Sequence, residues 1–300
     1  MVLLSSAISL SAQAGTRIKA LWRLGIVVLL GSLLILFLVF QPSLQLEPLS
    51  SPKSHQASKV HQVVRDWMLR YQDLSQASAR HQAFRDLSGI LQRYEDAPEA
   101  VGQTVLLNQS SGTQMLAVAV GALSSHGTPQ DQQALGRMLQ ASRSNPGKAM
   151  LVLPQIMLLE QPQTFLFNEL QTFAHQTQNE LLQENAELAL AGLWQHSART
   201  NERLAKEITL WLEKKKALVL ANPGELAHWL DLVGNTANAA FLADILEAST
   251  HPHVEVRARA VFALRLFRDE QAVSTLKHQL LVEQNAEVKR KIVEALGYLH

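Results

Sequence analysis

Hydrophobic and polar positions divide the chain into two parts. Residues 24–40, LGIVVLLGSLLILFLVF, form an uncharged apolar run, whereas after Ser58 the apolar residues recur at intervals of three and four. The first pattern leaves no polar face on a helix, which is typical of a membrane span, and the second is typical of amphipathic helices that pack on one side. We therefore predict one transmembrane helix at residues 20–40, followed by an all-α folded part.

The basic residues beside the apolar run predict its orientation. Arg17, Lys19 and Arg23 precede the run, and the first acidic residue, Glu47, follows it. By the positive-inside rule, the tail at residues 1–19 is expected in the cytoplasm. The chain would then lie in the inner (cytoplasmic) membrane, with everything after the anchor on the periplasmic side.

A cleaved signal peptide is the alternative to an anchor, but Phe40-Gln41-Pro42 offers no small-residue cleavage site. The next stretch, QPSLQLEPLSSPKSHQA at residues 41–57, is rich in Pro and Ser and has no apolar period. We expect it to be a flexible linker. Residues 58–300 are then one helical domain that begins where the periodic pattern begins.

Turn signals interrupt the amphipathic pattern at short intervals, which predicts short helices that must stack to bury their apolar faces. The signals are Asp96-Ala97-Pro98, Ser110-Ser111-Gly112, Gly127-Thr128-Pro129, Asn145-Pro146-Gly147, Gln161-Pro162, Asn222-Pro223-Gly224, Gly234-Asn235 and His251-Pro252.

An internal repeat is clearest near residue 300. The segment VEVRARAVFALR at residues 254–265 recurs 32 residues later as AEVKRKIVEALG at residues 286–297. A period of this size fits a unit of two helices. Within the repeat, Leu264 and Leu296 occupy equivalent positions, and we expect both to be fully buried.

This pattern, V-R/K-x-x-A/I-V-x-A-L, resembles the second helix of HEAT repeats. The preceding apolar residues Phe241, Leu242, Ile245 and Leu246 resemble the first helix. The resemblance is good over residues 225–300 and degenerate over 60–224. It implies a HEAT-like α-solenoid of helical hairpins, in which Arg257, and then Lys289, brace the next unit.

A second resemblance concerns Leu232-Val233-Gly234-Asn235 before Phe241, which is similar to the helical module of vitellogenin-like lipid-transfer proteins. That resemblance implies binding or transfer of a lipid or another apolar ligand. Tetratricopeptide repeats have a similar period, but their Gly-Tyr positions are missing here.

Composition and charge narrow the functional classes. A formal net charge of +1 predicts no nucleic-acid partner. The absence of cysteine excludes disulfides, thiolate zinc sites and cysteine nucleophiles. No nucleophile elbow, phosphate loop or zinc-protease motif is present, and there is no His-Glu dipeptide of the kind that binds iron in some helical-repeat enzymes. We interpret His251-Pro252-His253 as an exposed turn. We predict neither enzyme activity nor a metal or other cofactor.

Lys214-Lys215-Lys216 is the densest run of charge, and we interpret it as a solvated helix face.

The candidate binding residues come from one helix and its equivalents. Over residues 254–267, the apolar positions Val256, Ala260, Ala263, Leu264 and Phe267 share a face and predict the core side. The other side carries Arg259 and Phe262. One period later their equivalents are Lys291 and Glu294, and one period earlier they are His228 and Asp231.

Stacked repeats would align these six residues into a stripe with Phe262 as its apolar anchor, and Arg and aromatic side chains are common at interfaces. The competing interpretation places Phe262 in the core. The sequence therefore predicts a membrane-anchored, exported scaffold that binds a partner protein through a concave surface, with lipid binding as the alternative.

Overall fold

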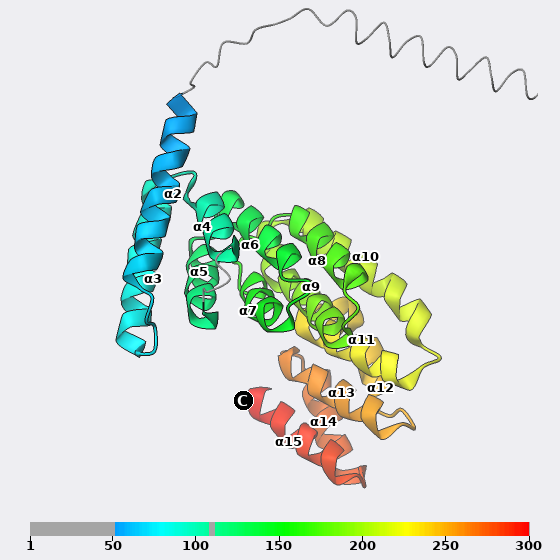
Figure 1. Cartoon of the computed structure of the whole chain (residues 1–300). Helices are drawn as coiled ribbons and strands as arrows, with labels where there is room; N and C mark the ends of the chain where they lie inside the picture. The colour runs from blue at the N-terminus through cyan, green and yellow to red at the C-terminus, as the bar shows by residue number, and fades with distance from the viewer. Residues whose placement is uncertain (1–51, 108–111, 300) are drawn as a thin grey trace, which may run out of the picture. The chain divides into compact units, whose positions relative to one another are not determined.

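The computed structural model describes residues 52–107 and 112–299, with side chains from residue 58 onward, and every regular element in these ranges is a helix (Figure 1). The prediction of an all-α fold is confirmed for this part of the chain. The predicted tail, the transmembrane helix at 20–40 and most of the linker lie outside the described residues. Within those residues, no helix combines the length and apolar character needed to cross a membrane.

The helices follow one another with short connections. Their bounds are α2 Pro52–Arg70, α3 Ala77–Arg93, α4 Ala97–Leu107, α5 Thr113–His126, α6 Pro129–Ala141, α7 Pro146–Met157, α8 Phe165–Gln176, α9 Glu180–Thr200, α10 Glu202–Val219, α11 Pro223–Thr236, α12 Leu242–Ala248, α13 Val254–Ala263, α14 Glu270–Val282 and α15 Ala286–Leu299, with short 3-10 turns η1 Ala239–Phe241 and η2 Leu264–Leu266.

Most predicted turn signals lie at helix ends for local reasons. At the start of α6, the Thr128 hydroxyl accepts a hydrogen bond from the Asp131 backbone N–H, while the Asp131 carboxylate accepts one from the Thr128 N–H. This reciprocal pair satisfies two donors that a helix start leaves free. The Asn222 side-chain oxygen caps α11 by accepting hydrogen bonds from the Gly224 and Glu225 N–H groups, and Pro223 follows it, where a missing N–H costs nothing.

Two boundary predictions are wrong. The linker was expected to extend to residue 57, but α2 already begins at Pro52, because Pro is tolerated in the first turn and no helix breaker follows it. Gly234-Asn235 was expected to be a turn, yet it lies inside α11, which continues to Thr236 and ends at Ala237 with a left-handed φ of 51°.

The helices alternate between two packed layers. The odd-numbered helices from α3 to α15 contact one another in chain order, as α3 with α5, α5 with α7, and so on to α13 with α15. The even-numbered helices lie beside them, with α4 against α6, α6 against α8 and α12 against α14. This arrangement is that of a helical-repeat array, in which each unit buries its apolar face against its neighbours.

The core lies between these layers and contains the predicted apolar face of α13. Val256, Ala260, Ala263 and Phe267 are all buried. Leu264 is fully buried as predicted, but the prediction for Leu296 is wrong because its side chain is only half-buried. The repeat places the two leucines at equivalent positions, but their neighbours differ. Helix α15 packs against η2, the segment that contains Leu264, whereas Leu296 lies on α15 itself.

The odd layer is stacked closely at Gly234. A Cβ atom on Gly234 would lie 2.7 Å from the Cβ of Ala263 and 2.9 Å from its Cα, which is closer than atoms of these types can approach. Gly234 therefore serves helix contact between α11 and α13 and not a turn. At the corresponding position of α15, a Cβ atom on Gly297 would meet no heavy atom within 4 Å.

The expected arginine brace is present in the last two units. The Arg257 guanidinium donates to Glu283 through Nε at 2.8 Å and through Nη2 at 3.1 Å. Its Nη1 also donates to the backbone oxygens of His251 and Pro252. Because Arg257 lies in the first turn of α13 and Glu283 follows α14, this two-pronged pair ties the turn of one unit to the turn of the next.

We predict opposite effects of the same substitution at two glycines. Gly234→Ala should lower the free energy of unfolding, because the overpacking cost of about 1–3 kcal/mol exceeds the gain in helix propensity. Gly297→Ala should raise it by up to about 1 kcal/mol, because the methyl group meets open space. Urea unfolding followed by circular dichroism measures both. Equal effects would contradict the close helix contact.

The brace also predicts a pH dependence. Hydrogen bonds from Arg257, and from the backbone N–H groups of Asn285 and Gln284, outweigh burial and lower the pKa of Glu283 from 4.5 to about 2. A depressed folded-state pKa adds stability that is complete above 4.5 and is lost as pH falls toward 2. Glu283→Gln should therefore lower the melting temperature at neutral pH and flatten its decline over that acid range. Glu247→Gln, at an exposed position, is the control and should change neither.

Candidate functional site

The six predicted site residues lie on three successive helices of the odd layer. His228 and Asp231 come from α11, Arg259 and Phe262 from α13, and Lys291 and Glu294 from α15. The stacking brings members of different repeats into contact. Arg259 Nη1 lies 3.0 Å from Asp231 Oδ2, and Lys291 Nζ lies 4.1 Å from the centre of the Phe262 ring. The expected alignment of these positions is therefore present in the structure.

Phe262 is neither a core residue nor a free apolar anchor. Its side chain is half-buried, and two cations lie over its ring, with Arg265 Cζ 3.9 Å and Lys291 Nζ 4.1 Å from the ring centre. Such contacts are attractive because the ring face carries negative charge density. Phe262 thus holds two positive side chains together on the surface of the odd layer.

Asp231 is the central acid of this cluster. Partial burial raises its pKa, against the opposing attraction of Arg259, His228, Arg265 and Lys291. When the pKa of an aspartate is raised despite several nearby cations, the loss of hydration destabilises its ionised form more than the ion pair stabilises it. The ionised form therefore costs folding stability at neutral pH, and such sites are often found where a surface serves binding.

Arg265 adds an excess of positive charge. It donates hydrogen bonds to the Phe262 backbone oxygen and to Asn235, but among the described residues no carboxylate oxygen lies within 4.0 Å of it. Burial lowers its pKa, and the more distant acids only partly offset this effect. Arg259 pairs with Asp231, and both Lys291 and Arg290 pair with Glu294, so that Arg265 is the cation of this cluster that has no carboxylate within 4.0 Å among the described residues.

Sequence analysis missed the group that extends the stripe toward α9 and α10. His228 Nε2 lies 2.7 Å from Glu187, which also pairs with Lys215 at 2.9 Å. Burial disfavours the charge on Glu187, but the hydrogen bonds from His228 and Lys215 outweigh it and lower its pKa. Lys215 and Lys216, which pairs with Asp244, are therefore not the solvated face that the lysine run suggested. No sequence signal marked these pairs, because their partners are 28 to 41 residues away.

A groove of about 410 Å³ opens beside the cluster, between α13 and α15. Its lining consists of Val254, Glu255, Ala258, Arg259 and Phe262 from α13, with Glu287 and Lys291 from α15. Of these residues, the apolar Val254 and Ala258 were not predicted. The spacing explains their position, because Val254, Ala258 and Phe262 follow one another at intervals of four residues along α13 and therefore lie on one face.

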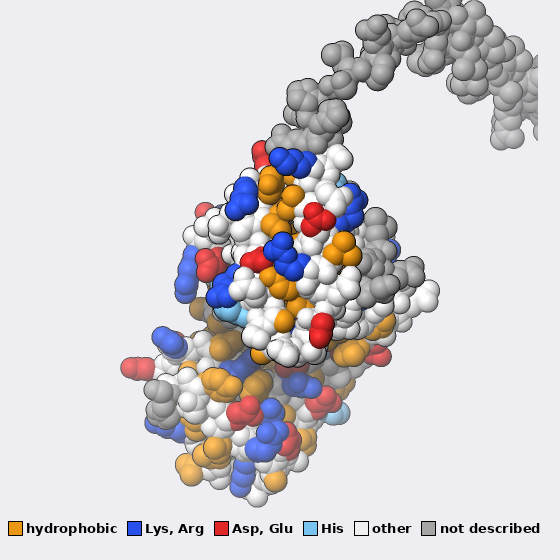
Figure 2. Space-filling model, turned by 60° about the vertical axis from the view of Figure 1, so that its left-hand side comes forward, with side chains coloured by type: hydrophobic (Ala, Val, Ile, Leu, Met, Phe, Trp, Pro, Cys, Tyr) orange, Lys and Arg blue, Asp and Glu red, His pale blue; other side chains and the backbone are white. Residues whose placement is uncertain are grey.

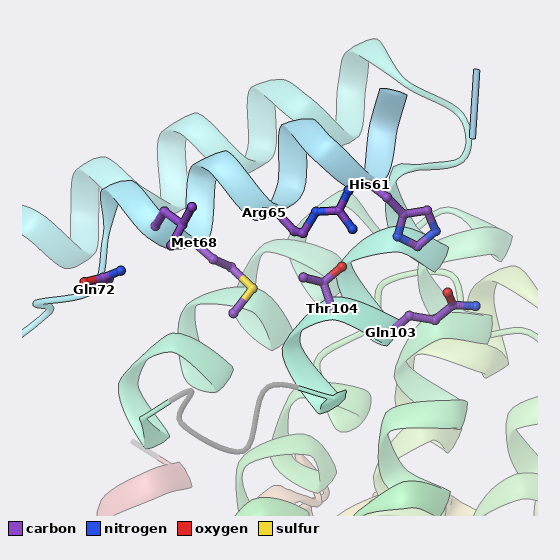
Figure 3. Close-up of a pocket in the computed structure, with 7 residues that line it drawn as sticks. His61, Arg65, Met68, Gln72, Gln103 and Thr104 are labelled. Atoms are coloured by element: carbon purple, nitrogen blue, oxygen red, sulfur yellow. The ribbon is translucent and has the colours of Figure 1, made fainter. Parts of the chain in front are cut away.

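A second cavity, of about 440 Å³, lies between α2 and α4 (Figure 3). Figure 3 shows His61, Arg65 and Met68 on α2, with Gln72 just after it, and Gln103 and Thr104 on α4. The lining contains no carboxylate, and Arg65 already donates a hydrogen bond to Gln62 at 2.9 Å. This cavity offers no arrangement of acid, base and nucleophile.

Charges of both signs are mixed with apolar side chains on the face drawn in Figure 2. Within residues 52–107 and 112–299, no three His, Asp or Glu side chains are placed to hold a metal ion. His251 and His253 stack on each other at the turn before α13. The prediction that the chain is not an enzyme stays a prediction.

Comparison with known proteins identifies the repeat. Residues 230–299 match the family described as HEAT repeats. This segment, which spans α12 to α15 and part of α11, is therefore similar to HEAT repeats, and the described part of the chain is an array of stacked helices. No curated protein sequence matches the chain.

Among solved structures, the chain is similar to human deoxyhypusine hydroxylase in complex with glycerol. The identity is 13%, the alignment covers 81% of this chain and 98% of that one, and the TM-score is 0.32. A TM-score of this size supports no conclusion about function.

Proposed function

We propose that this chain is a membrane-anchored, exported helical-repeat scaffold that binds a partner protein through its concave surface. The binding surface in this proposal is the stripe of His228, Asp231, Arg259, Phe262, Lys291 and Glu294, extended by Arg265. The observation that carries it is the cluster around the half-buried Phe262, in which Arg265 and Lys291 lie over the ring and Arg259 pairs with Asp231.

The electrostatics of this cluster favour a binding role over a purely structural one. Core positions of the same helices are apolar and fully buried, such as Val261 and Leu264. Burial, by contrast, raises the pKa of Asp231 although Arg259 lies 3.0 Å from its carboxylate. A partner that supplies compensating charge would regain the lost stabilisation on binding, because it could pair with groups that are already desolvated and held in place.

Lipid binding between helices is the weaker alternative at the positions that can be checked. Gly234 is in contact with Ala263, and a Cβ on Gly192 would lie 2.9 Å from the Met157 methyl carbon. These contacts leave no space for an acyl chain between α11 and α13 or between α7 and α9 at those points. A protein partner on the exposed face of the odd layer requires no such space.

The membrane anchor in this proposal rests on the uncharged run at residues 24–40 and on the basic residues before it. We expect an alkaline phosphatase fused after Ser58 to be active and a fluorescent protein at the same position to be dark. Replacing Arg17, Lys19 and Arg23 by Glu should weaken this orientation. Fluorescence with an inactive phosphatase in the unaltered sequence would contradict the proposed export.

Removal of the aromatic side chain tests the binding surface. Phe262→Ala in the full-length chain should reduce co-purification of the partner by at least ~30-fold, as for an interface hot spot. The thermal midpoint should change by less than about 4 °C, because Phe262 is only half-buried. Leu281→Ala is the matched control, since Leu281 is a large apolar side chain that is 81% exposed on α14.

The Leu281→Ala control should retain the partner and should have the same thermal midpoint as the unaltered chain. Global loss of folding in Phe262→Ala would place Phe262 in the core. Full retention of the partner would show that binding uses another surface.

A further inference from the structure

Charge is distributed unevenly along the chain, although its formal net value is only +1. Residues 52–93, which form α2, α3 and the turn between them, contain seven Lys or Arg and three Asp or Glu. Residues 94–300 contain 17 Lys or Arg and 22 Asp or Glu. Residues 52–93, the α2–α3 hairpin, are therefore a basic segment before an acidic remainder, and their surface favours an anionic partner.

Contacts between the two helices hold the α2–α3 hairpin together. The Trp67 indole N–H donates to the Ala83 backbone oxygen at 3.0 Å, and both residues are buried. The Tyr71 hydroxyl donates to the Asp86 carboxylate at 2.6 Å. The outward side chains of the hairpin are therefore presented from a fixed backbone, which reduces the ordering cost of binding.

A groove of about 480 Å³ lies between α2 and α3. Its charged lining residues are Arg70, Arg85 and Arg93, with Asp66 and Asp86. Arg70 Nη1 lies 3.6 Å from Asp86 Oδ2. Among the described residues, no carboxylate oxygen lies within 4.0 Å of Arg85 or Arg93, and both side chains are exposed. These two arginines are therefore accessible to an anion from solvent.

The two acids of the groove are engaged within the hairpin. The Asp66 carboxylate accepts a hydrogen bond from Gln62 at 2.7 Å. The Asp86 carboxylate accepts one from Gln82 at 2.7 Å as well as the one from Tyr71. The Tyr71 hydrogen bond is the main cause of the lowered pKa of Asp86, and the charges of nearby arginines contribute less. Three arginines thus face two aspartates, and the groove keeps an excess of one positive charge.

The other charged side chains of the hairpin add to this excess. Among the described residues, no carboxylate oxygen lies within 4.0 Å of Lys59, Arg65 or Arg80. Arg65 donates to a glutamine, and Arg80 donates to the backbone oxygens of the turn. The remaining acid, Asp73, lies in that turn and accepts from the Ser75 N–H. The positive charge of the hairpin is therefore not neutralised by the helices around it.

Apolar side chains lie among these charges. Val63 and Ile90 line the groove and are half-buried. Figure 2, in which α2 and α3 are turned forward, shows a band of apolar side chains with basic ones on both sides of it, among some acidic ones. A surface that combines basic and apolar side chains is typical of protein segments that lie at a membrane surface.

We propose that the α2–α3 hairpin lies against the bilayer and binds anionic phospholipid headgroups through the arginines of its groove. This inference rests on the proposed membrane anchor and adds a second contact with the membrane. Residues 41–51, between the predicted anchor and α2, span at most ~40 Å and so keep the hairpin within reach of the bilayer. Each Lys or Arg near an anionic surface strengthens binding ~5-fold. Headgroups bound on this surface require no space between packed helices.

The absence of cysteine allows a single fluorescent label to be attached at a chosen position. Gly89 lines the groove, and Gly297 lies on α15. At both positions a Cβ atom would meet no heavy atom within 4 Å, so Gly89→Cys and Gly297→Cys are matched label sites. The labelled full-length chains are inserted into nanodiscs of phosphatidylcholine alone or mixed equally with phosphatidylglycerol. Nitroxide-labelled headgroups in both nanodiscs quench a label that lies near the bilayer surface.

We expect quenching of the label at position 89 to rise at least ~2-fold in the anionic nanodiscs, because the basic hairpin is attracted to their surface. High salt should remove the rise, because it screens interactions between exposed charges. The label at position 297 should show no such rise, because it lies in the acidic remainder of the chain.

Charge reversal on the hairpin tests the arginines. Arg85→Glu together with Arg93→Glu should abolish the rise at position 89 and leave the helical circular dichroism unchanged, because both side chains are exposed. Arg268→Glu together with Lys277→Glu is the control. It makes the same change in net charge at two exposed side chains outside the hairpin and should preserve the rise.

Equal quenching at position 89 in both nanodiscs would overturn this inference, and so would a rise that survives the change of Arg85 and Arg93. An equal rise at position 297 would also contradict it, because the hairpin would then not be the contact. The anchor has a separate readout. A chain that does not co-elute with neutral nanodiscs contradicts the anchor and the inference that rests on it, whereas co-elution without the rise contradicts the hairpin contact alone.

Discussion

The close contact of α11 with α13 at Gly234 is the constraint on which the proposed binding surface depends. Because Gly234 has no side chain, the backbone of α11 lies against Ala263, and α13 takes a fixed register on it. That register places Arg259 beside Asp231 across the two helices. A larger residue at position 234 would move α13 outward and separate this pair. The stripe is therefore a consequence of helix stacking and not of local sequence.

The same stacking explains why charge is concentrated on the exposed face of the odd layer. Each unit closes its own apolar contacts internally, as the buried Val256, Val261 and Leu264 show. The residues between them must face outward and contact residues of the next unit. Arg257 and Glu283 make such a contact through an ion pair with two hydrogen bonds. Asp231 also forms an ion pair, with Arg259, but burial raises its pKa, so this second pair restores less of the lost hydration than the first.

The repeat pattern predicted the helical class, the core face of α13 and the positions that meet in the stripe, because all three follow from spacing along the chain. It did not predict features, such as the burial of a side chain, that depend on which element packs beside a residue. Leu264 and Leu296 are equivalent in sequence but differ in burial, and Gly234 serves helix contact although Gly-Asn pairs favour turns. Pairs such as Glu187 with His228 join different units, so no local pattern identifies them.

Phe262 is the point at which the repeat departs from itself. Its equivalents are Asp231 in the preceding unit and Glu294 in the following one, so a single aromatic ring lies between two acidic positions. The aromatic ring attracts Arg265 and Lys291 through its face without neutralising them, and Lys291 also pairs with Glu294. Repetition supplies charged positions on both α13 and α15 beside the groove, and this one departure from repetition supplies an aromatic side chain at its apolar part.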